Sequence, residues 1–406
     1  MTLEFEKLTD SLEKMAHSAA RRQQESDALL AAALTQLRRY AVSWERLERC
    51  LERAVAETNE KFFRAARPIA ATEPLDQGIP APDCPPEALL IASDGSQIMP
   101  DRHGEFLYYL INVGLIIYEH GYGRSPQTIT YPTLGFPKPA PTTETEAVDE
   151  DAFVANSGAI SVRRDMAEIG ALADTVWEWR RGIQPLLAIL DQRLLYWPIG
   201  SSGGADSQEA IQAWLAAMKK MQDAGCLLAG YIDRPGKSSV MTLLATLQIE
   251  ESGFDLASLT EQRDWSGPND ADLYGRILQP GERSPVFIDI SHHNRRFAEQ
   301  DPALEVCFFY LNPGKGIARV DIPRWVAEQP AAVATTHGLL YDQCQILGDY
   351  PYVLTRADEI AVVGRREQEE LEHRIALRMQ DYGLAGSITG KQQAKNFARS
   401  DKTRHE

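Results

Sequence analysis

Three short apolar runs in this chain each end in an aspartate. The run at 88–92 leads into Ser93-Asp94-Gly95-Ser96, and two later runs lead into Asp191 and Asp233. Runs this short, bounded by turn-forming residues, predict buried strands. Because the strands of an open α/β sheet share a crevice at their carboxyl ends, these carboxylates can converge there. We expect the first strand to end at residue 93 and Gly95 to turn the backbone, and such a pattern taken alone is more often a plain turn than a metal site.

A glutamate on a neighbouring helix would complete an oxygen-rich site. The segment 158–181 is predicted to be a helix, with Glu168 in its middle on the same side as Arg164. Carboxylate oxygens suit Mg²⁺ or Mn²⁺, and two such ions support phosphoryl chemistry by activating a water and stabilising the leaving oxygen. The order of strand Asp, helix Glu and strand Asp resembles that of ribonuclease H-like nucleases. We therefore predict an α/β fold of this type, with a mixed sheet flanked by helices.

A glycine-rich loop raises a nucleotide-binding alternative. Gly230 and Gly236-Lys237-Ser238 lie between a predicted strand and a predicted helix, as in a phosphate-binding P-loop. The P-loop pattern has four residues between its glycines, whereas this loop has five, and its Pro235 has no amide to offer a phosphate. We expect Lys237 to contact a nucleic-acid phosphate or to face solvent. Asp233 is a weaker candidate, because it can cap the helix that begins near Ser238.

Composition excludes several classes of protein. The chain has 406 residues, of which 44% are hydrophobic and 25% charged, as in ordinary globular proteins. Its net charge of −16 argues against an evenly basic surface that coats nucleic acid. The five cysteines form no Cys-x-x-Cys pair, so neither a zinc ribbon nor a disulfide framework is indicated. No secretion signal and no run of membrane-spanning length is found, which favours a cytoplasmic protein.

The elements that must position these residues divide the chain into four parts. Residues 1–66 predict a helical hairpin or coiled-coil-like segment, 67–87 a Pro-rich connector, 88–382 the α/β domain and 383–406 a flexible basic tail. A stripe of apolar residues beginning at Leu30 fits either a helix packed on its own domain or a partner-binding arm. Further strands are expected near 106–118, 127–131, 186–190, 226–232, 286–290, 305–311 and 317–321, and helices near 207–223, 323–334 and 353–381.

Several segments of the α/β domain resemble the successive motifs of the NurA nuclease family. The matching segments are Ser93-Asp94-Gly95-Ser96, 229–235 (AGYIDRP), 308–323 (FFYLN … IARVDIP) and 350–358 (YPYVLTRAD). The resemblance implies a ribonuclease H-like core, a homodimer, dependence on Mn²⁺ or Mg²⁺, and action on DNA ends together with the hexameric ATPase HerA. It also implies single-strand endonuclease and 5′-to-3′ exonuclease activities in DNA end resection.

The resemblance carries the family's site onto particular residues. Asp94, Glu168 and Asp191 match its acidic metal ligands, and Tyr350 matches a tyrosine that would orient DNA or a metal-bound water. The family usually has Ala-His where this chain has Ala357-Asp358, so we expect Asp358 as a fourth metal ligand. Lys237 would stabilise charge on the scissile phosphate. The alternative is a catalytically weakened DNA-binding or adaptor subunit of a HerA-type ATPase complex.

Overall fold

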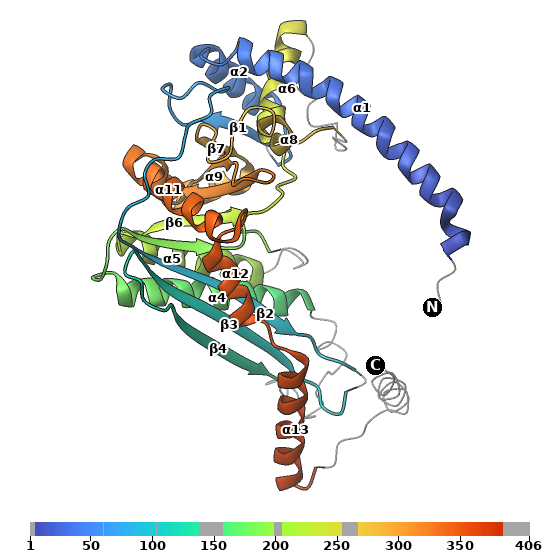
Figure 1. Cartoon of the computed structure of the whole chain (residues 1–406), viewed down its shortest axis with the longest axis vertical. Coiled ribbons are helices and arrows are strands. Elements are labelled where there is room, and N and C mark those ends of the chain that lie inside the picture. Colours follow the sequence, from blue (N-terminus) through green and yellow to red (C-terminus); the bar gives the residue numbers. More distant parts are fainter. Residues whose placement is uncertain are drawn as a thin grey trace. The chain divides into compact units, whose positions relative to one another are not determined.

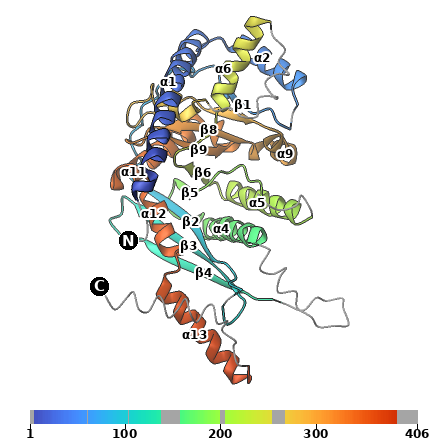
Figure 2. The same cartoon turned by 90° about the vertical axis from the view of Figure 1, so that its right-hand side faces the viewer.

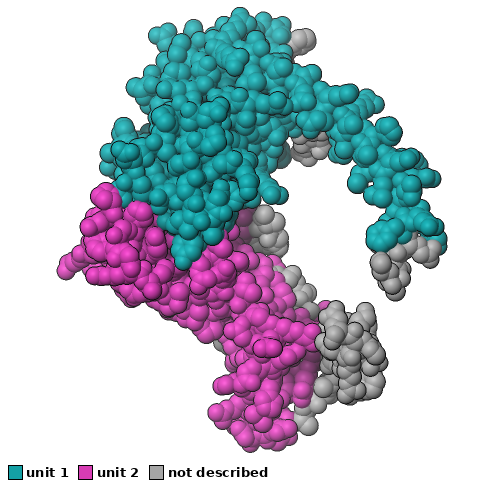
Figure 3. Space-filling view, viewed as in Figure 1, with its two compact units in different colours: residues 1–85, 192–195, 227–352 teal, residues 86–191, 196–226, 353–406 magenta. Residues whose placement is uncertain are grey.

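The computed structural model describes residues 5–59, 61–102, 104–137, 157–198, 205–253 and 267–384. The chain forms two compact units, coloured separately in Figure 3. Unit 1 contains residues 1–85, 192–195 and 227–352, and unit 2 contains residues 86–191, 196–226 and 353–406. Most of the expected basic tail and of the polar stretch after residue 137 lies outside the described residues.

Unit 2 is built on four strands in the order β5-β2-β3-β4, all of which are labelled in Figure 2. Strands β2 (Ala88–Ile98), β3 (Tyr109–His120) and β4 (Gln127–Gly135) form an antiparallel meander, and β5 (Leu186–Leu190) pairs in parallel with β2. Its helices are α4 (Ser157–Trp179), α5 (Ala205–Asp223), α12 (Tyr352–Ala361, in unit 2 from residue 353) and α13 (Arg365–Asp381). Helix α4 packs on β2 and β3 and lies beside α5, as Figure 2 also shows.

Strand β2 continues through the position where a turn was expected. Its pairing with β3 runs from Ala88 to Ile98, with Gly95 opposite Val113. The predicted turn at Gly95 is therefore wrong. A long antiparallel partner supplies hydrogen bonds along the whole segment, which outweighs the local turn preference of an Asp-Gly pair.

Unit 1 has five strands in the order β1-β7-β8-β9-β6. The strands are β1 (Ala65–Pro68), β6 (Leu227–Ile232), β7 (Phe287–Ile290), β8 (Val306–Leu311) and β9 (Ala318–Pro323), and the pairs β1–β7, β7–β8, β8–β9 and β6–β9 are antiparallel. Its helices are α1 (Thr9–Arg39), α2 (Trp44–Glu57), α6 (Ser239–Ser252), α8 (Asp270–Tyr274), α9 (His292–Gln300), α10 (Arg324–Ala327) and α11 (Pro330–Leu347), with short 3₁₀ turns at Phe5–Leu8 and Pro302–Leu304.

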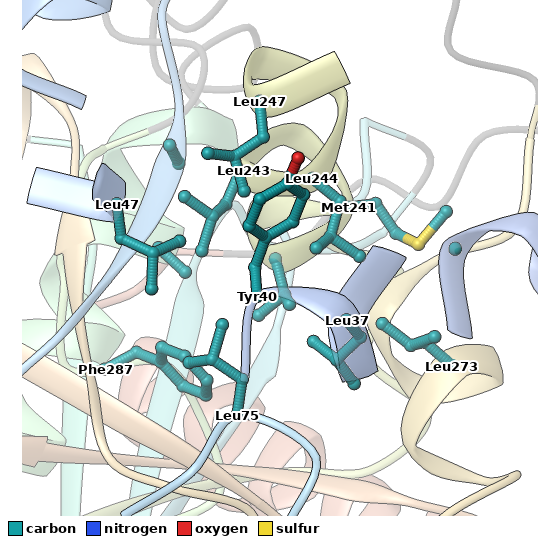
Figure 4. Close-up of a cluster of buried hydrophobic side chains, with 14 of the residues drawn as sticks. Leu37, Tyr40, Leu47, Leu75, Met241, Leu243, Leu244, Leu247, Leu273 and Phe287 are labelled. Carbon is teal, nitrogen blue, oxygen red and sulfur yellow. The ribbon is translucent and has the colours of Figure 1, made fainter. Parts of the chain in front are cut away.

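The N-terminal helices contribute to the hydrophobic core of unit 1. Leu37 of α1 and Leu47 of α2 are buried with Leu244 of α6 and Phe287 of β7 in the cluster drawn in Figure 4. The first half of α1 has no buried residue before Leu30, and it extends away from this core (Figure 1). The apolar stripe that begins at Leu30 thus packs on its own unit.

Two predicted helices are each divided in two. The segment 323–334 contains α10 and the start of α11, which begins at Pro330. The segment 353–381 contains α12 and α13, and the break between them lies at Val362–Gly364. Gly364 is the N-cap of α13. Its N–H donates to the side-chain carboxylate of Glu367 at 2.7 Å, which satisfies a backbone donor at the start of the helix. Among the described residues, no helix is both long and apolar enough to cross a membrane.

Candidate active site

Two of the predicted carboxylates meet on one face of the unit 2 sheet. Asp94 lies in β2 directly opposite Gly114 of β3. A Cβ on Gly114 would lie only 2.5 Å from the backbone nitrogen of Ala361 and 2.7 Å from the carbonyl oxygen of Ala357, so the glycine lets α12 lie directly on the sheet. This close packing brings Asp358 of α12 near Asp94, close enough for the charge of Asp358 to act on the Asp94 carboxyl group.

The environment of Asp94 makes its negative charge costly. Burial raises the pKa of Asp94, and the nearby charge of Asp358 raises it further. The N–H of Gly95, which donates to Oδ1 of Asp94 at 2.7 Å, opposes this effect. A divalent cation between the two carboxylates would remove the repulsion, and an all-oxygen donor set suits Mg²⁺ or Mn²⁺.

Asp191 comes next to Asp94 through the parallel pairing of β2 and β5. The last residue pair of this ladder joins Ser93 to Leu190, and Asp94 and Asp191 are the residues that follow on the two strands. Neighbouring strands lie about 4.8 Å apart, so the two backbones are adjacent at this point. Strand β5 ends at Leu190, as predicted, and Asp191 is exposed. The strand-end position expected for Asp191 is confirmed.

Glu168 approaches the same stretch of β2 from α4. Its side chain is buried, and its Oε2 atom lies 3.2 Å from the position that a Cβ on Gly95 would occupy. Because Gly95 has no side chain, the Glu168 carboxylate can lie against β2 at this point. The Ser93 hydroxyl also donates to the backbone carbonyl of Glu168 at 3.4 Å. Among the described residues, no three of the four predicted carboxylates have oxygens that all lie within 4.8 Å of one another. The four carboxylates therefore lie near this part of β2 but do not form a compact cluster.

Lys237 and Tyr350 belong to unit 1. The Lys237 ammonium donates to Oδ2 of Asp289 at 2.9 Å, and the same oxygen accepts from Arg319 at 2.9 Å. Burial and the charge of Arg319 lower the pKa of Lys237, whereas Asp289 opposes this. The Tyr350 ring packs edge-on against Tyr231 with centroids 5.3 Å apart. The predicted catalytic roles of Lys237 and Tyr350 stay predictions.

The glycine-rich loop joins β6 to α6, as expected, but its details differ from a phosphate-binding loop. The first amides of α6, those of Val240 and Met241, donate to the buried carboxylate of Asp270 at 2.9 and 2.8 Å. These donors are therefore occupied by the protein. The predicted cap by Asp233 is wrong, because its side chain pairs with Arg234 at 3.6 Å and the distant Asp270 takes its place.

Arg164 was expected only to lie on the same side of its helix as Glu168. Its side chain lies across Gly95, where a Cβ would be 2.8 Å from its Cγ, and its guanidinium pairs with Asp165 at 2.8 Å. The four-residue spacing from Glu168 on one helix face is the sequence signal that could have identified it.

The topology and acidic residues of unit 2 define a class of protein. An antiparallel meander, a fourth strand parallel to the first, and helices α4 and α12 on its two faces form a ribonuclease H-like α/β fold, as predicted. The sequence model of the NurA domain matches residues 89–363, which is more than half of the chain. The chain therefore belongs to the NurA family.

Similar solved structures include three nucleases. The NurA nuclease from Sulfolobus solfataricus is 13% identical with a TM-score of 0.47, and the match covers 75% of this chain and 86% of that chain. The catalytic domain of human endonuclease V is 11% identical with a TM-score of 0.31, covering 82% and 96%. LC9-RNase H1, a type 1 RNase H with the type 2 active-site motif, is 10% identical with a TM-score of 0.21, covering 50% and 90%. No curated protein matches this chain.

Proposed function

We propose that this chain is a divalent-metal-dependent deoxyribonuclease. The observation that supports this most strongly is the close packing of α12 on Gly114, which places the charge of Asp358 near the buried Asp94 inside a NurA domain. Asp191 follows in register on the neighbouring strand, and Glu168 reaches the same backbone from α4. Carboxylates that lie close together repel one another when ionised, and such an arrangement is typical of a site that binds a cation.

Asp94, Glu168, Asp191 and Asp358 would hold Mn²⁺ or Mg²⁺. When bound, the metal supplies an activated water and stabilises the leaving oxygen of the phosphodiester. The protein keeps Asp94 oriented through the N–H of Gly95, and it keeps Asp358 beside it through the close packing of α12 on Gly114. The roles predicted for Lys237 and Tyr350 of unit 1, stabilising phosphate charge and orienting DNA, remain predictions.

The biological role rests on membership of the NurA family. We infer that the protein is a single-strand endonuclease and 5′-to-3′ exonuclease that works as a homodimer in DNA end resection, together with a HerA-type hexameric ATPase. Asp358, where the family usually has histidine, supports a second candidate: a DNA-binding or adaptor subunit whose cleavage activity is weakened.

Cleavage of single-stranded DNA tests the proposal. The full chain should degrade a labelled oligonucleotide with Mn²⁺ and leave it intact with EDTA, and Asp94→Ala should abolish the cleavage. Asp174→Ala is the matched control, because Asp174 lies on α4 but is exposed and pairs with Lys220 at 2.6 Å. If the wild-type chain binds a HerA-type ATPase yet leaves DNA intact with Mn²⁺, the adaptor function replaces the nuclease function.

A further inference from the structure

Arg164 is a basic side chain that lies near the candidate carboxylates of unit 2. It lies on α4 one turn before Glu168, and its side chain crosses Gly95 on β2, with Cδ 3.2 Å from where a Cβ would lie. Burial lowers the pKa of Arg164, but the charges of Asp165, Glu168 and Asp94 outweigh this and raise it. The guanidinium of Arg164 thus lies near the acidic groups of the candidate metal site.

A chain of partly buried hydrogen bonds, backed by a buried aromatic stack, fixes the orientation of this guanidinium. Nε and Nη2 of Arg164 donate to Oδ1 of Asp165 at 3.3 and 2.8 Å. The other carboxylate oxygen of Asp165 accepts from the hydroxyl of Tyr196 at 3.2 Å. The buried Tyr196 ring in turn stacks on the buried Trp214, with centroids 4.5 Å apart and an interplanar angle of 14°. Both carboxylate oxygens of Asp165 therefore accept hydrogen bonds, one from Arg164 and one from Tyr196. Asp165 in this way fixes the orientation of the Arg164 side chain.

One edge of the guanidinium remains available. Within the described residues both hydrogen bonds of Arg164 go to Asp165, which leaves its Nη1 without a protein partner. Its side chain is 32% exposed, so a ligand can reach it. A partly exposed ion pair by itself adds little stability, and it needs no buried Tyr-Trp support. A donor held rigidly with a free edge is instead typical of phosphate recognition.

We propose that Arg164 binds a non-bridging oxygen of the DNA phosphate that is cleaved at the carboxylate site, and that Asp165 and Tyr196 position it. This inference rests on the proposed function, because it names the group that holds the substrate at that same site. The substrate class is the phosphodiester backbone of single-stranded DNA.

Two substitutions on α4 test this assignment. Arg164→Gln should lower kcat/KM for single-stranded DNA on the order of 100-fold, as removal of one oriented charge-stabilising donor does in other enzymes. It should also reduce the magnitude of the slope of log K for DNA binding against log salt by about 0.7, which is the contribution of one phosphate contact. The control is Arg163→Gln, since the exposed Arg163 bonds only to Tyr109 among the described residues, at 3.0 Å.

A double-mutant cycle separates positioning from a purely structural role of Tyr196. Tyr196→Phe keeps the stacked ring and removes the hydroxyl, so it should lower the activity of the wild type and have no further effect on Arg164→Gln. Additive losses would overturn the positioning role. If Arg164→Gln cleaves DNA like Arg163→Gln, with the same salt slope, the assignment of Arg164 is wrong while the nuclease stands. If Asp94→Ala also cleaves normally, the proposed function fails as well.

Discussion

At the scale of residues, the charge of Asp358 adds to the cost of ionising Asp94. The backbone around Gly114 holds Asp358 near Asp94, so burial and the charge of Asp358 both oppose ionisation of Asp94 in the metal-free protein. This opposition is what a bound cation would relieve. The pair therefore links metal binding, pH and stability in a way that a surface acidic cluster does not.

The first prediction concerns the stability of this pair. The pKa of Asp94 is raised in the folded state. Ionisation of Asp94 therefore costs the folded state no stability at low pH, and this cost appears as pH rises above the ordinary pKa of aspartate. Asp358→Asn should therefore raise the melting temperature of the metal-free protein at neutral pH and leave it little changed near pH 4. Thermal unfolding in EDTA across this range measures the effect. A difference that does not vary with pH would contradict the account.

The buried Asp270 allows a second prediction, about pH. Burial raises its pKa from 3.8 to about 6, despite its hydrogen bonds from α6 and from Tyr310. The folded state thus binds this proton more tightly than the unfolded state, and the stability due to protonation is lost as pH rises from about 4 to about 6. Relative to Asp270→Asn, the wild type should lose about 3 kcal/mol across this window. Urea unfolding at several pH values measures it, and parallel curves for the two proteins would refute the prediction.

At the scale of elements, the contact of α12 with β3 decides where Asp358 lies. Gly114→Ala would place a methyl group 2.5 Å from the Ala361 nitrogen, so α12 must move. We expect a loss of about 2 kcal/mol in the free energy of unfolding and a large loss of cleavage activity. Gly170→Ala on α4 is the control, because its Cβ would meet no atom within 4 Å. It should stabilise the helix by up to about 1 kcal/mol, measured by denaturant unfolding. Equal effects of the two substitutions would count against this packing.

The sequence predicts those elements whose signals are local. The apolar run at 186–190 ends where expected, and the periodic segment around Glu168 is a helix. Features set by distant partners were missed. Gly95 extends a strand because β3 pairs with it, and α6 is capped by Asp270, the first residue of α8.

The same reasoning applies to the candidate site. The acidic residues could be chosen from their types and their strand-end or helical positions. That Asp358 meets Asp94 depends on the absence of a side chain at Gly114, and the support of Arg164 by Tyr196 depends on residues more than one element apart. No local pattern carries that information, because such contacts arise only when the sheet and its helices pack.

At the scale of the whole molecule, the end of α1 from Leu30 onward and all of α2 contribute to the core of unit 1. Leu47 of α2 is 1% exposed in the same core as α6 and β7, whereas Leu12 of α1 is 50% exposed. Leu47→Ala should lower the free energy of unfolding by about 3 kcal/mol, and Leu12→Ala should change it by less than about 0.5 kcal/mol. Denaturant unfolding distinguishes the two. If Leu47→Ala leaves the free energy of unfolding unchanged, the N-terminal helices do not contribute to the stability of this unit.

The central claim is that the carboxylates around Asp94 form a divalent-metal site. Calorimetric titration of Mn²⁺ into the metal-free full chain tests it most directly, with Asp94→Asn and the α4 control Asp174→Asn measured alongside. The account predicts that the wild type and Asp174→Asn bind Mn²⁺ with equal affinity and that Asp94→Asn loses this binding. Equal binding by all three proteins, or none by the wild type, would contradict it.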